Sequence, residues 1–170
     1  TVSVIDLSNY TVVAAVPVGD DPRDVEVLPS GEYVYSANSD SRDVTVIRTS
    51  DNTVDRTVSI GGPVGRIASL ADGSYLYLSS DGRVRTVRVS DYTEGGAIDV
   101  GAGPGDIAVP AVGGYVFVPN GSGNTVSVIR TSDHTVVATV TVGNSPYAAT
   151  ATPDGNFVYV ANRGSRTVSV

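Results

Sequence analysis

The sequence lacks cysteine, methionine, tryptophan and lysine, and it contains one histidine, His134. Without cysteine there is no disulfide framework, no thiol nucleophile and no thiolate metal site. Haem ligation needs histidine or methionine, so redox chemistry on a haem is a remote expectation. We expect no metal, no organic cofactor and no catalytic residue, and stability that comes from packing and strand pairing.

Long apolar runs and basic clusters are also missing. No apolar segment approaches the roughly 20 residues that span a bilayer, and the chain opens at Thr1 without a signal-like segment. The formal net charge of −7 argues against a polyanionic partner such as nucleic acid or an anionic membrane. The sequence therefore predicts a soluble, mature or excised piece with no nucleic-acid partner and no membrane span.

Valine, threonine, serine, glycine and tyrosine are abundant, and they favour strands over helices. One segment returns at steps of 42, 40, 42 and 42 residues: TVSVID at Thr1, DVTVIR at Asp43, RVRTVR at Arg83, TVSVIR at Thr125 and TVSV at Thr167. Glycines keep the same register, at Gly19, Gly61, Gly101 and Gly143 and again at Gly31, Gly73, Gly113 and Gly155. Residues 1–170 therefore form one repeat array, with repeats starting near 1, 43, 83 and 125 and an extra strand at 167–170.

Each unit divides into four short strands by the alternation of apolar and polar residues. In the first complete unit we expect strands at about 23–28, 32–37, 43–47 and 53–60. The first strand is rich in small residues and suits an innermost position. The fourth alternates cleanly, and one copy holds Pro17, which a sheet edge tolerates. The third copy carries Glu94-Gly95-Gly96 in its outer strand and should be the least regular.

The aromatic strands YVYSAN, YLYLSS, YVFVPN and FVYVAN, followed by Asn-Thr-Val-Ser-Val, Val-Gly-x-x-Pro and Pro-Asp-Gly segments, resemble the YVTN-family β-propeller repeat over the whole chain. The resemblance implies an all-β propeller of four-stranded antiparallel blades. Four repeats imply either a small closed ring or part of a larger or oligomeric ring. The family resemblance also implies an extracellular or cell-surface protein of the surface-layer type.

Propellers bind ligands at one mouth of the central axis, where loops enter the inner strands. By repeat register Asp24, Arg66 and Asp106 are equivalent, with Ala148 as the fourth member and Tyr147 beside it. A cation or a polar ligand group among these side chains is one interpretation. The other is that Arg66 simply neutralises the two carboxylates at a wet mouth.

The single histidine and two glycosylation sequons are further candidate sites. His134 falls in a turn between rim strands, where we expect an ordinary surface residue and not a general base or a metal ligand. Two glycosylation sequons begin at Asn9 and Asn120, both in predicted turns where a glycan could be attached.

Three functions are compatible with these features. The leading hypothesis is a non-enzymatic extracellular propeller module for scaffolding or protein contact. An alternative is a propeller lyase or lactonase, which should place histidine and carboxylates at the channel mouth. A carbohydrate-binding propeller is a third, weakly supported because tryptophan is absent.

The two ends of the array compete for one strand position, because Thr167–Val170 repeats Thr1–Val4. A surplus strand exposes backbone donors and acceptors that recruit another chain. We expect self-association through strand pairing at the termini, or continuation into further blades, over a self-contained four-bladed monomer.

Overall fold

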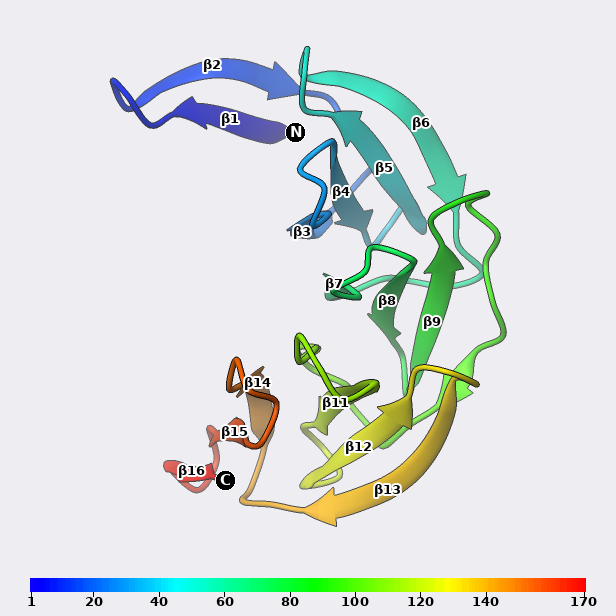
Figure 1. Ribbon diagram of the computed structural model, residues 1–170, viewed down its shortest axis with the longest axis vertical. Helices are drawn as coiled ribbons and strands as arrows, with labels where there is room; N and C mark the ends of the chain where they lie inside the picture. Colours follow the sequence, from blue (N-terminus) through cyan, green and yellow to red (C-terminus); the bar gives the residue numbers. More distant parts are fainter.

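The computed structural model describes residues 1–170 and contains sixteen β-strands and no helix. The strands form five antiparallel sheets, which follow one another around an open arc (Figure 1). We number these sheets as blades 1 to 5 in chain order. The expected all-β architecture is confirmed.

The blades differ in how many strands they contain. Blade 1 has two strands, β1 (Val2–Asp6) and β2 (Thr11–Val16). Blade 2 has four, β3 (Pro22–Val27), β4 (Tyr33–Asn38), β5 (Asp43–Arg48) and β6 (Thr53–Ser59). Blade 3 also has four, β7 (Ile67–Ser69), β8 (Tyr75–Ser80), β9 (Arg83–Arg88) and β10 (Ile98–Asp99).

Blades 4 and 5 have three regular strands each. Blade 4 consists of β11 (Tyr115–Asn120), β12 (Thr125–Arg130) and β13 (Thr135–Thr141). Its innermost segment, 104–109, joins β11 only through two isolated bridges, Pro104 to Asn120 and Ala108 to Phe117. Blade 5 consists of β14 (Pro146–Ala151), β15 (Val158–Asn162) and β16 (Thr167–Ser169).

Within a blade the strands pair in chain order from the inside of the arc to its rim, as the sequence predicts (Figure 1). The irregular third copy is also found where expected. Because Gly95 and Gly96 interrupt it, the outer strand of blade 3 shrinks to β10 and one bridge between Val87 and Glu94. The first strand of blade 4 is the segment reduced to bridges.

The turn between the third and outer strands is built the same way in four blades. Its third residue has a left-handed backbone, with φ between 55° and 58° at Tyr10, Asn52, Tyr92 and His134. The preceding carboxylate or amide holds this shape: Asp51 Oδ1 accepts hydrogen bonds from the Thr53 amide (3.1 Å) and hydroxyl (2.7 Å). The Thr53 hydroxyl bond is the largest cause of the lowered pKa of Asp51.

The hairpins between the first two strands turn at Gly31, Gly73 and Gly155, each with φ near 70° and each donating its amide to the carbonyl three residues earlier. This confirms the expected equivalence for three of the four glycines. In blade 4 the pattern differs, because the turn spreads over Gly113 (φ 105°) and Gly114 (φ 68°).

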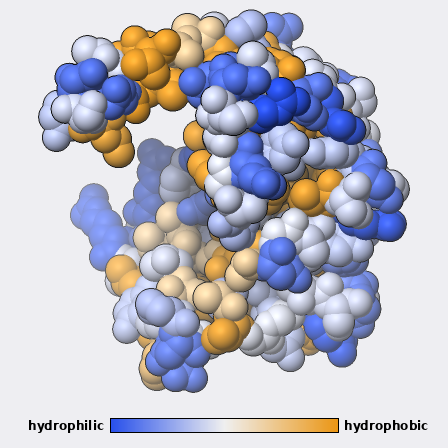
Figure 2. Space-filling model, turned by 45° about the horizontal axis from the view of Figure 1, so that its top comes forward, coloured by the Kyte–Doolittle hydropathy of each residue, from blue (hydrophilic) through white to orange (hydrophobic).

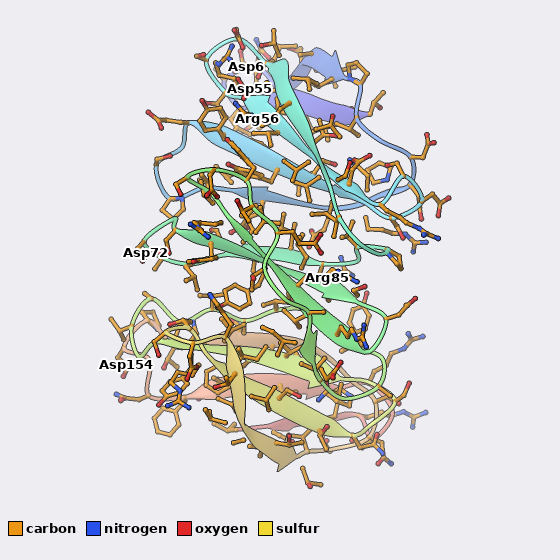
Figure 3. The ribbon with its side chains drawn as sticks, turned by 90° about the vertical axis from the view of Figure 1, so that its right-hand side faces the viewer. Asp6, Asp55, Arg56, Asp72, Arg85 and Asp154 are labelled. Atoms are coloured by element: carbon orange, nitrogen blue, oxygen red, sulfur yellow. The ribbon has the colours of Figure 1, made fainter.

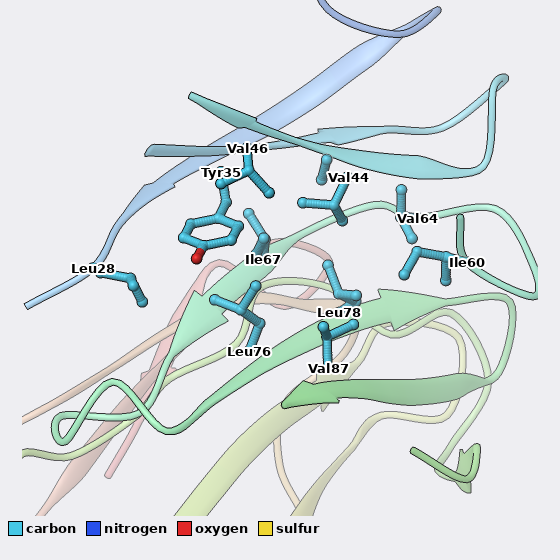
Figure 4. Packing of buried hydrophobic residues seen from close by; sticks show 11 residues of the cluster. Leu28, Tyr35, Val44, Val46, Ile60, Val64, Ile67, Leu76, Leu78 and Val87 are labelled. Atoms are coloured by element: carbon cyan, nitrogen blue, oxygen red, sulfur yellow. The ribbon is translucent and has the colours of Figure 1, made fainter. Parts of the chain in front are cut away.

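The core lies between blades, not within one sheet. Eleven buried side chains join blades 2 and 3, with Tyr35, Val44 and Val46 facing Leu76 and Val87 (Figure 4). A second cluster joins blades 3 and 4 in the same way, from Tyr77 and Val84 to Val116 and Ile129. Both faces of a blade are therefore apolar, and a blade is stable only when others cover it.

The arc is open, and its two ends stand apart (Figure 1). Residues 1–170 therefore do not form the closed ring of four blades that was one expectation; membership of a larger or oligomeric ring stays a prediction. Blade 1 projects as an arm that carries hydrophobic side chains over an open space (Figure 2). Exposed apolar residues gather on blade 1 and on blade 5, for example Ile5, Tyr10, Phe157 and Tyr159.

Candidate functional site

The four predicted residues of the channel mouth lie where the chain enters the inner strands: Asp24, Arg66, Asp106 and Tyr147. Only Arg66 and Tyr147 contact each other through their side chains. Arg66 Nη2 donates a 2.5 Å hydrogen bond to the Tyr147 hydroxyl, and its guanidinium lies 5.6 Å from the centre of the Tyr147 ring. Arg66 precedes β7 in blade 3 and Tyr147 belongs to β14 in blade 5. This contact therefore bridges across blade 4.

Asp24 and Asp106 do not join this pair. Asp24 Oδ2 accepts the backbone amide of Ile67 at 3.1 Å and so ties β3 to β7 of the next blade. Asp106 Oδ1 accepts the amide of Ile107 at 3.0 Å, and the Asp106 amide donates to the Tyr147 carbonyl. Neither carboxylate forms an ion pair with Arg66, so the interpretation that Arg66 neutralises both is wrong.

Glu26 extends the same linkage one step along β3. Its Oε1 accepts both the amide (2.9 Å) and the hydroxyl (2.6 Å) of Ser69. The innermost strands β3 and β7 belong to different sheets and share no backbone hydrogen bonds as strand partners. The side chains of Asp24 and Glu26 link them instead, by accepting hydrogen bonds from β7. The sequence did not reveal this role, although the alternation of PRDVEV places both carboxylates on one face.

A hollow lies beside these residues, and none of them belongs to its wall. It has a volume of about 490 Å³ and lies against loops of blades 2, 3 and 4, with Arg23, Asp81, Gly82 and Gly103 among its lining residues. Arg23 is held by Asp21 at 2.6 Å. The hollow offers one paired guanidinium, one carboxylate and otherwise backbone and small side chains.

His134 is more than a surface turn residue. Its Nδ1 lies 2.7 Å from the Tyr77 hydroxyl, and its ring meets Tyr75 edge-on with centroids 4.7 Å apart. The turn of blade 4 therefore rests on the second strand of blade 3. Burial lowers the pKa of His134, and the nearby carboxylate of Asp133 opposes that shift. The imidazole is at the rim, away from the mouth residues.

The rim carries ion pairs that run along the outer strands (Figure 3). Asp55 lies between Arg48 (2.5 Å) and Arg56 (2.9 Å), and the Arg56 hydrogen bond is the largest cause of the lowered pKa of Asp55. Both guanidinium groups are well exposed, so these pairs contribute little to stability.

Asn120 is not a glycan site in the folded chain. Its side chain is fully buried, and Nδ2 donates to Thr125 Oγ1 at 3.0 Å and to Ser127 Oγ at 2.9 Å. The nitrogen that would carry the glycan is enclosed, so that expectation is wrong. Asn9 is exposed, and its Oδ1 accepts the amide and hydroxyl of Thr11; a glycan there stays a prediction.

The buried asparagine recurs at the end of the second strand in three blades. Asn38 and Asn162 make the same bonds to third-strand hydroxyls, at Thr45 (2.9 Å) and at Ser169 (2.8 Å). In the sequence, Asn38 and Asn162 stand out only as part of the motif that resembles the YVTN repeat. The signal was present in the spacing, with Asn five and seven residues before Ser, Thr or Asp.

No three His, Cys, Asp or Glu side chains are grouped so that they could hold a metal ion. No helix is long and apolar enough to cross a membrane.

No protein-family model matches the sequence, and a search of curated proteins finds no relative. Solved structures are similar in fold. Hydrazine synthase of Kuenenia stuttgartiensis aligns with a TM-score of 0.81 and 24% identity over 87% of this chain, and U3-55K with a TM-score of 0.71 and 13% identity over 88%. The chain covers 45% and 51% of those two proteins. At this identity the likeness concerns the fold alone, and it shows that residues 1–170 have a β-propeller fold.

Proposed function

We propose that this chain is a non-enzymatic protein-interaction module that works outside the cell or at the cell surface. The observation that carries the proposal is the exposure of large apolar side chains on two faces, blade 1 and blade 5. Tyr10 is 83% exposed, Phe157 55% and Val168 62%. Apolar patches of this kind mark contact surfaces for other proteins.

The non-enzymatic part is supported by where the ionisable groups lie. Asp24 and Glu26 are used to join inner strands, and Arg66 is held by Tyr147. His134, which a lyase or lactonase would need at the channel mouth, packs against Tyr75 at the rim. Each of these groups already has a structural task.

The location is supported by the resemblance to YVTN-type surface proteins. Treatment of intact cells with an impermeant protease tests it. Cleavage of the chain on intact cells supports a surface position. Protection until the cells are broken contradicts it.

The interaction role is tested by placing a photo-cross-linking amino acid at position 157, on the exposed face of blade 5, and in a second preparation at Ser90 in an exposed rim turn. The proposal expects protein adducts at position 157 and few at position 90. Equal or absent adducts at the two positions would count against it.

A further inference from the structure

We propose that a hollow at the rim between blades 3 and 4 binds the guanidinium group of an arginine side chain on a partner protein. This rim hollow has a volume of about 400 Å³, within the usual range of ligand pockets, about 300–1,000 Å³. Its lining includes Tyr75, Arg88 and the Glu94-Gly95-Gly96 segment of blade 3, and Asp133 and His134 of blade 4. Blades 2 and 5 flank these two blades, so the site involves neither end of the array and lies apart from the faces that carry the interaction role above.

The neighbouring interface, between blades 2 and 3, shows what fits such a place. There the guanidinium of Arg56, in the outer strand of blade 2, lies 4.3 Å from the centre of the Tyr92 ring. Arg56 Nε also donates to Asp55 Oδ2 at 2.9 Å, and the two side chains lie together at the rim (Figure 3). A planar guanidinium suits an aromatic face and a carboxylate at the same time.

Blade 3 lacks the side chains that fill this place in blade 2. Thr53 and Thr93 pair with the last residue of the third strand in blades 2 and 3. Two and three residues further on, blade 2 has Asp55-Arg56 and blade 3 has Gly95-Gly96. A β-carbon on Gly96 would have no heavy atom within 4 Å. The rim hollow is therefore the space that an arginine side chain occupies one interface earlier.

The walls of the rim hollow keep the ring on which such a group rests. His134 takes the place of Tyr92, because each is the left-handed turn residue of the blade that follows. The imidazole is fixed by Tyr75, with ring centroids 4.7 Å apart, and by the Tyr77 hydroxyl. Burial lowers the pKa of His134, so the ring is uncharged at neutral pH and does not repel a cation.

Asp133 supplies the hydrogen-bond acceptor. Its contacts with Thr135 and Arg130 all use Oδ1, which leaves Oδ2 without a donor. Glu94, the other carboxylate of the rim hollow, is already paired with Arg85 at 2.6 Å. Asp133 is therefore the carboxylate that receives the incoming guanidinium, and a charge-assisted bond of this kind is among the stronger hydrogen bonds.

Arg88 does not exclude a second guanidinium from the rim hollow. Its counterpart Arg48 lies with Arg56 around one carboxylate in blade 2, at 2.5 Å and 2.9 Å from Asp55. Arg88 itself is held aside by Asp91 at 3.3 Å. The opening lies over exposed residues 95–97, where an arginine on another protein can enter, and the net charge of −7 favours the approach of a basic segment.

The first test uses the fact that His134 is the only histidine. Its imidazole signals in an NMR spectrum therefore need no further assignment. Addition of N-acetyl-arginine amide, whose capped ends mimic an arginine within a polypeptide, should shift these signals until the site is saturated. N-acetyl-lysine amide carries the same charge without the planar guanidinium and should shift them little.

The second test fills the rim hollow from within the chain. Gly96→Arg should displace the His134 signals in the direction that N-acetyl-arginine amide does, and should abolish any further shift on its addition. Gly96→Ala is the matched control and should still bind the capped arginine, because it changes the backbone position without filling the space.

Asp133→Asn tests the acceptor. The turn should survive this change, because Asn9 makes the same bonds to Thr11 in blade 1 that Asp133 makes to Thr135. Loss of the negative charge should weaken the binding of N-acetyl-arginine amide. Undiminished binding in Asp133→Asn would contradict the role given to this carboxylate.

Four results would overturn the proposal. The absence of a saturable shift with N-acetyl-arginine amide removes the site, and an equal shift with the lysine derivative removes its preference for guanidinium. Binding that survives in Gly96→Arg lies elsewhere. Binding of free arginine without the capped form removes the origin in a partner protein. Phe157 does not line the rim hollow, so adducts at position 157 without arginine binding here would retain the interaction role and remove only this site.

Discussion

Gly101 lies directly against the side-chain amide of the buried Asn120. A β-carbon at position 101 would come within 2.5 Å of Asn120 Cγ, closer than real β-carbons approach any atom. Gly143 meets Asn162 in the same way, and Gly19 meets Asn38. In these three repeats the glycine that precedes the blade therefore lies against that blade's buried asparagine, whereas Gly61 meets Arg85 instead.

Gly101→Ala should destabilise the fold by about 1–3 kcal/mol, because the added methyl must displace a buried, hydrogen-bonded side chain. Gly96→Ala is the matched control, since an added β-carbon there has no heavy atom within 4 Å and its backbone is not left-handed. Urea unfolding monitored by circular dichroism compares them. If Gly96→Ala lowered the free energy of unfolding as much as Gly101→Ala, this explanation would be contradicted.

Asn120→Ala should cost about 1–3 kcal/mol in the free energy of unfolding, because it removes two buried hydrogen bonds and leaves a void. Asn9→Ala, in an exposed turn, should cost less. If the chain is glycosylated, mass spectrometry should find the glycan lost in Asn9→Gln and retained in Asn120→Gln. A glycan on Asn120 in folded protein would contradict the buried position.

The repeat spacing and the alternation of apolar residues predicted the strands, their order from inside to rim and the irregular outer strand of blade 3. These features depend on residues close in sequence. Burial depends on what lies opposite in space, so Asn120 looked like an exposed sequon although it is enclosed by Thr125, Ser127 and Gly101.

Blade 3 shows why the site residues were harder to predict. Arg85 stands where Thr45 and Ser127 stand in other blades, and it pairs with Glu94 at 2.6 Å while its Nη2 donates to the Gly61 carbonyl. Glu94, which looked like part of a degenerate strand, is thus the ion-pair partner of the half-buried Arg85. The replacement of a small hydroxyl residue by an Arg85–Glu94 ion pair becomes visible only when the two strands are seen side by side.

His134 should make stability depend on pH. Its pKa is lowered in the folded chain by burial against Tyr75 and Tyr77, with only Asp133 opposing. The unfolded chain therefore takes up the proton more readily, and the contribution of His134 is present above the ordinary histidine pKa of 6.5 and is lost as pH falls below it.

Replacing His134 by Asn, the residue that holds the same turn in blade 2, should flatten this dependence just below pH 6.5 and leave the steeper loss at lower pH. That second loss comes from carboxylates with lowered pKa such as Asp72 and Asp154. The melting temperatures of the unmodified chain and of His134→Asn, measured at a series of pH values below and above 6.5, test this prediction. An unchanged slope in His134→Asn would show that other groups dominate.

Substitutions of Asp24 test whether its carboxylate only links two blades or also binds a ligand at the channel mouth. If its task is to hold the Ile67 amide, Asp24→Ala should lower the free energy of unfolding by about 1–2 kcal/mol, because a charge-assisted hydrogen bond to a half-buried amide is lost. Asp24→Asn keeps an acceptor and should lose less. Asp20→Ala, an exposed carboxylate in the preceding loop, is the control and should be nearly neutral.

A ligand role predicts a different result. A divalent cation held at the mouth would raise the melting temperature of the unmodified chain in proportion to its excess over the dissociation constant, and Asp24→Ala would abolish that rise. We expect calcium and magnesium to leave the melting temperature unchanged in the unmodified chain, in Asp24→Ala and in Asp106→Ala alike. A cation-dependent rise that disappears in Asp24→Ala but persists in Asp20→Ala would assign the mouth to metal binding, because the Ile67 hydrogen bond alone gives a cation nothing to stabilise.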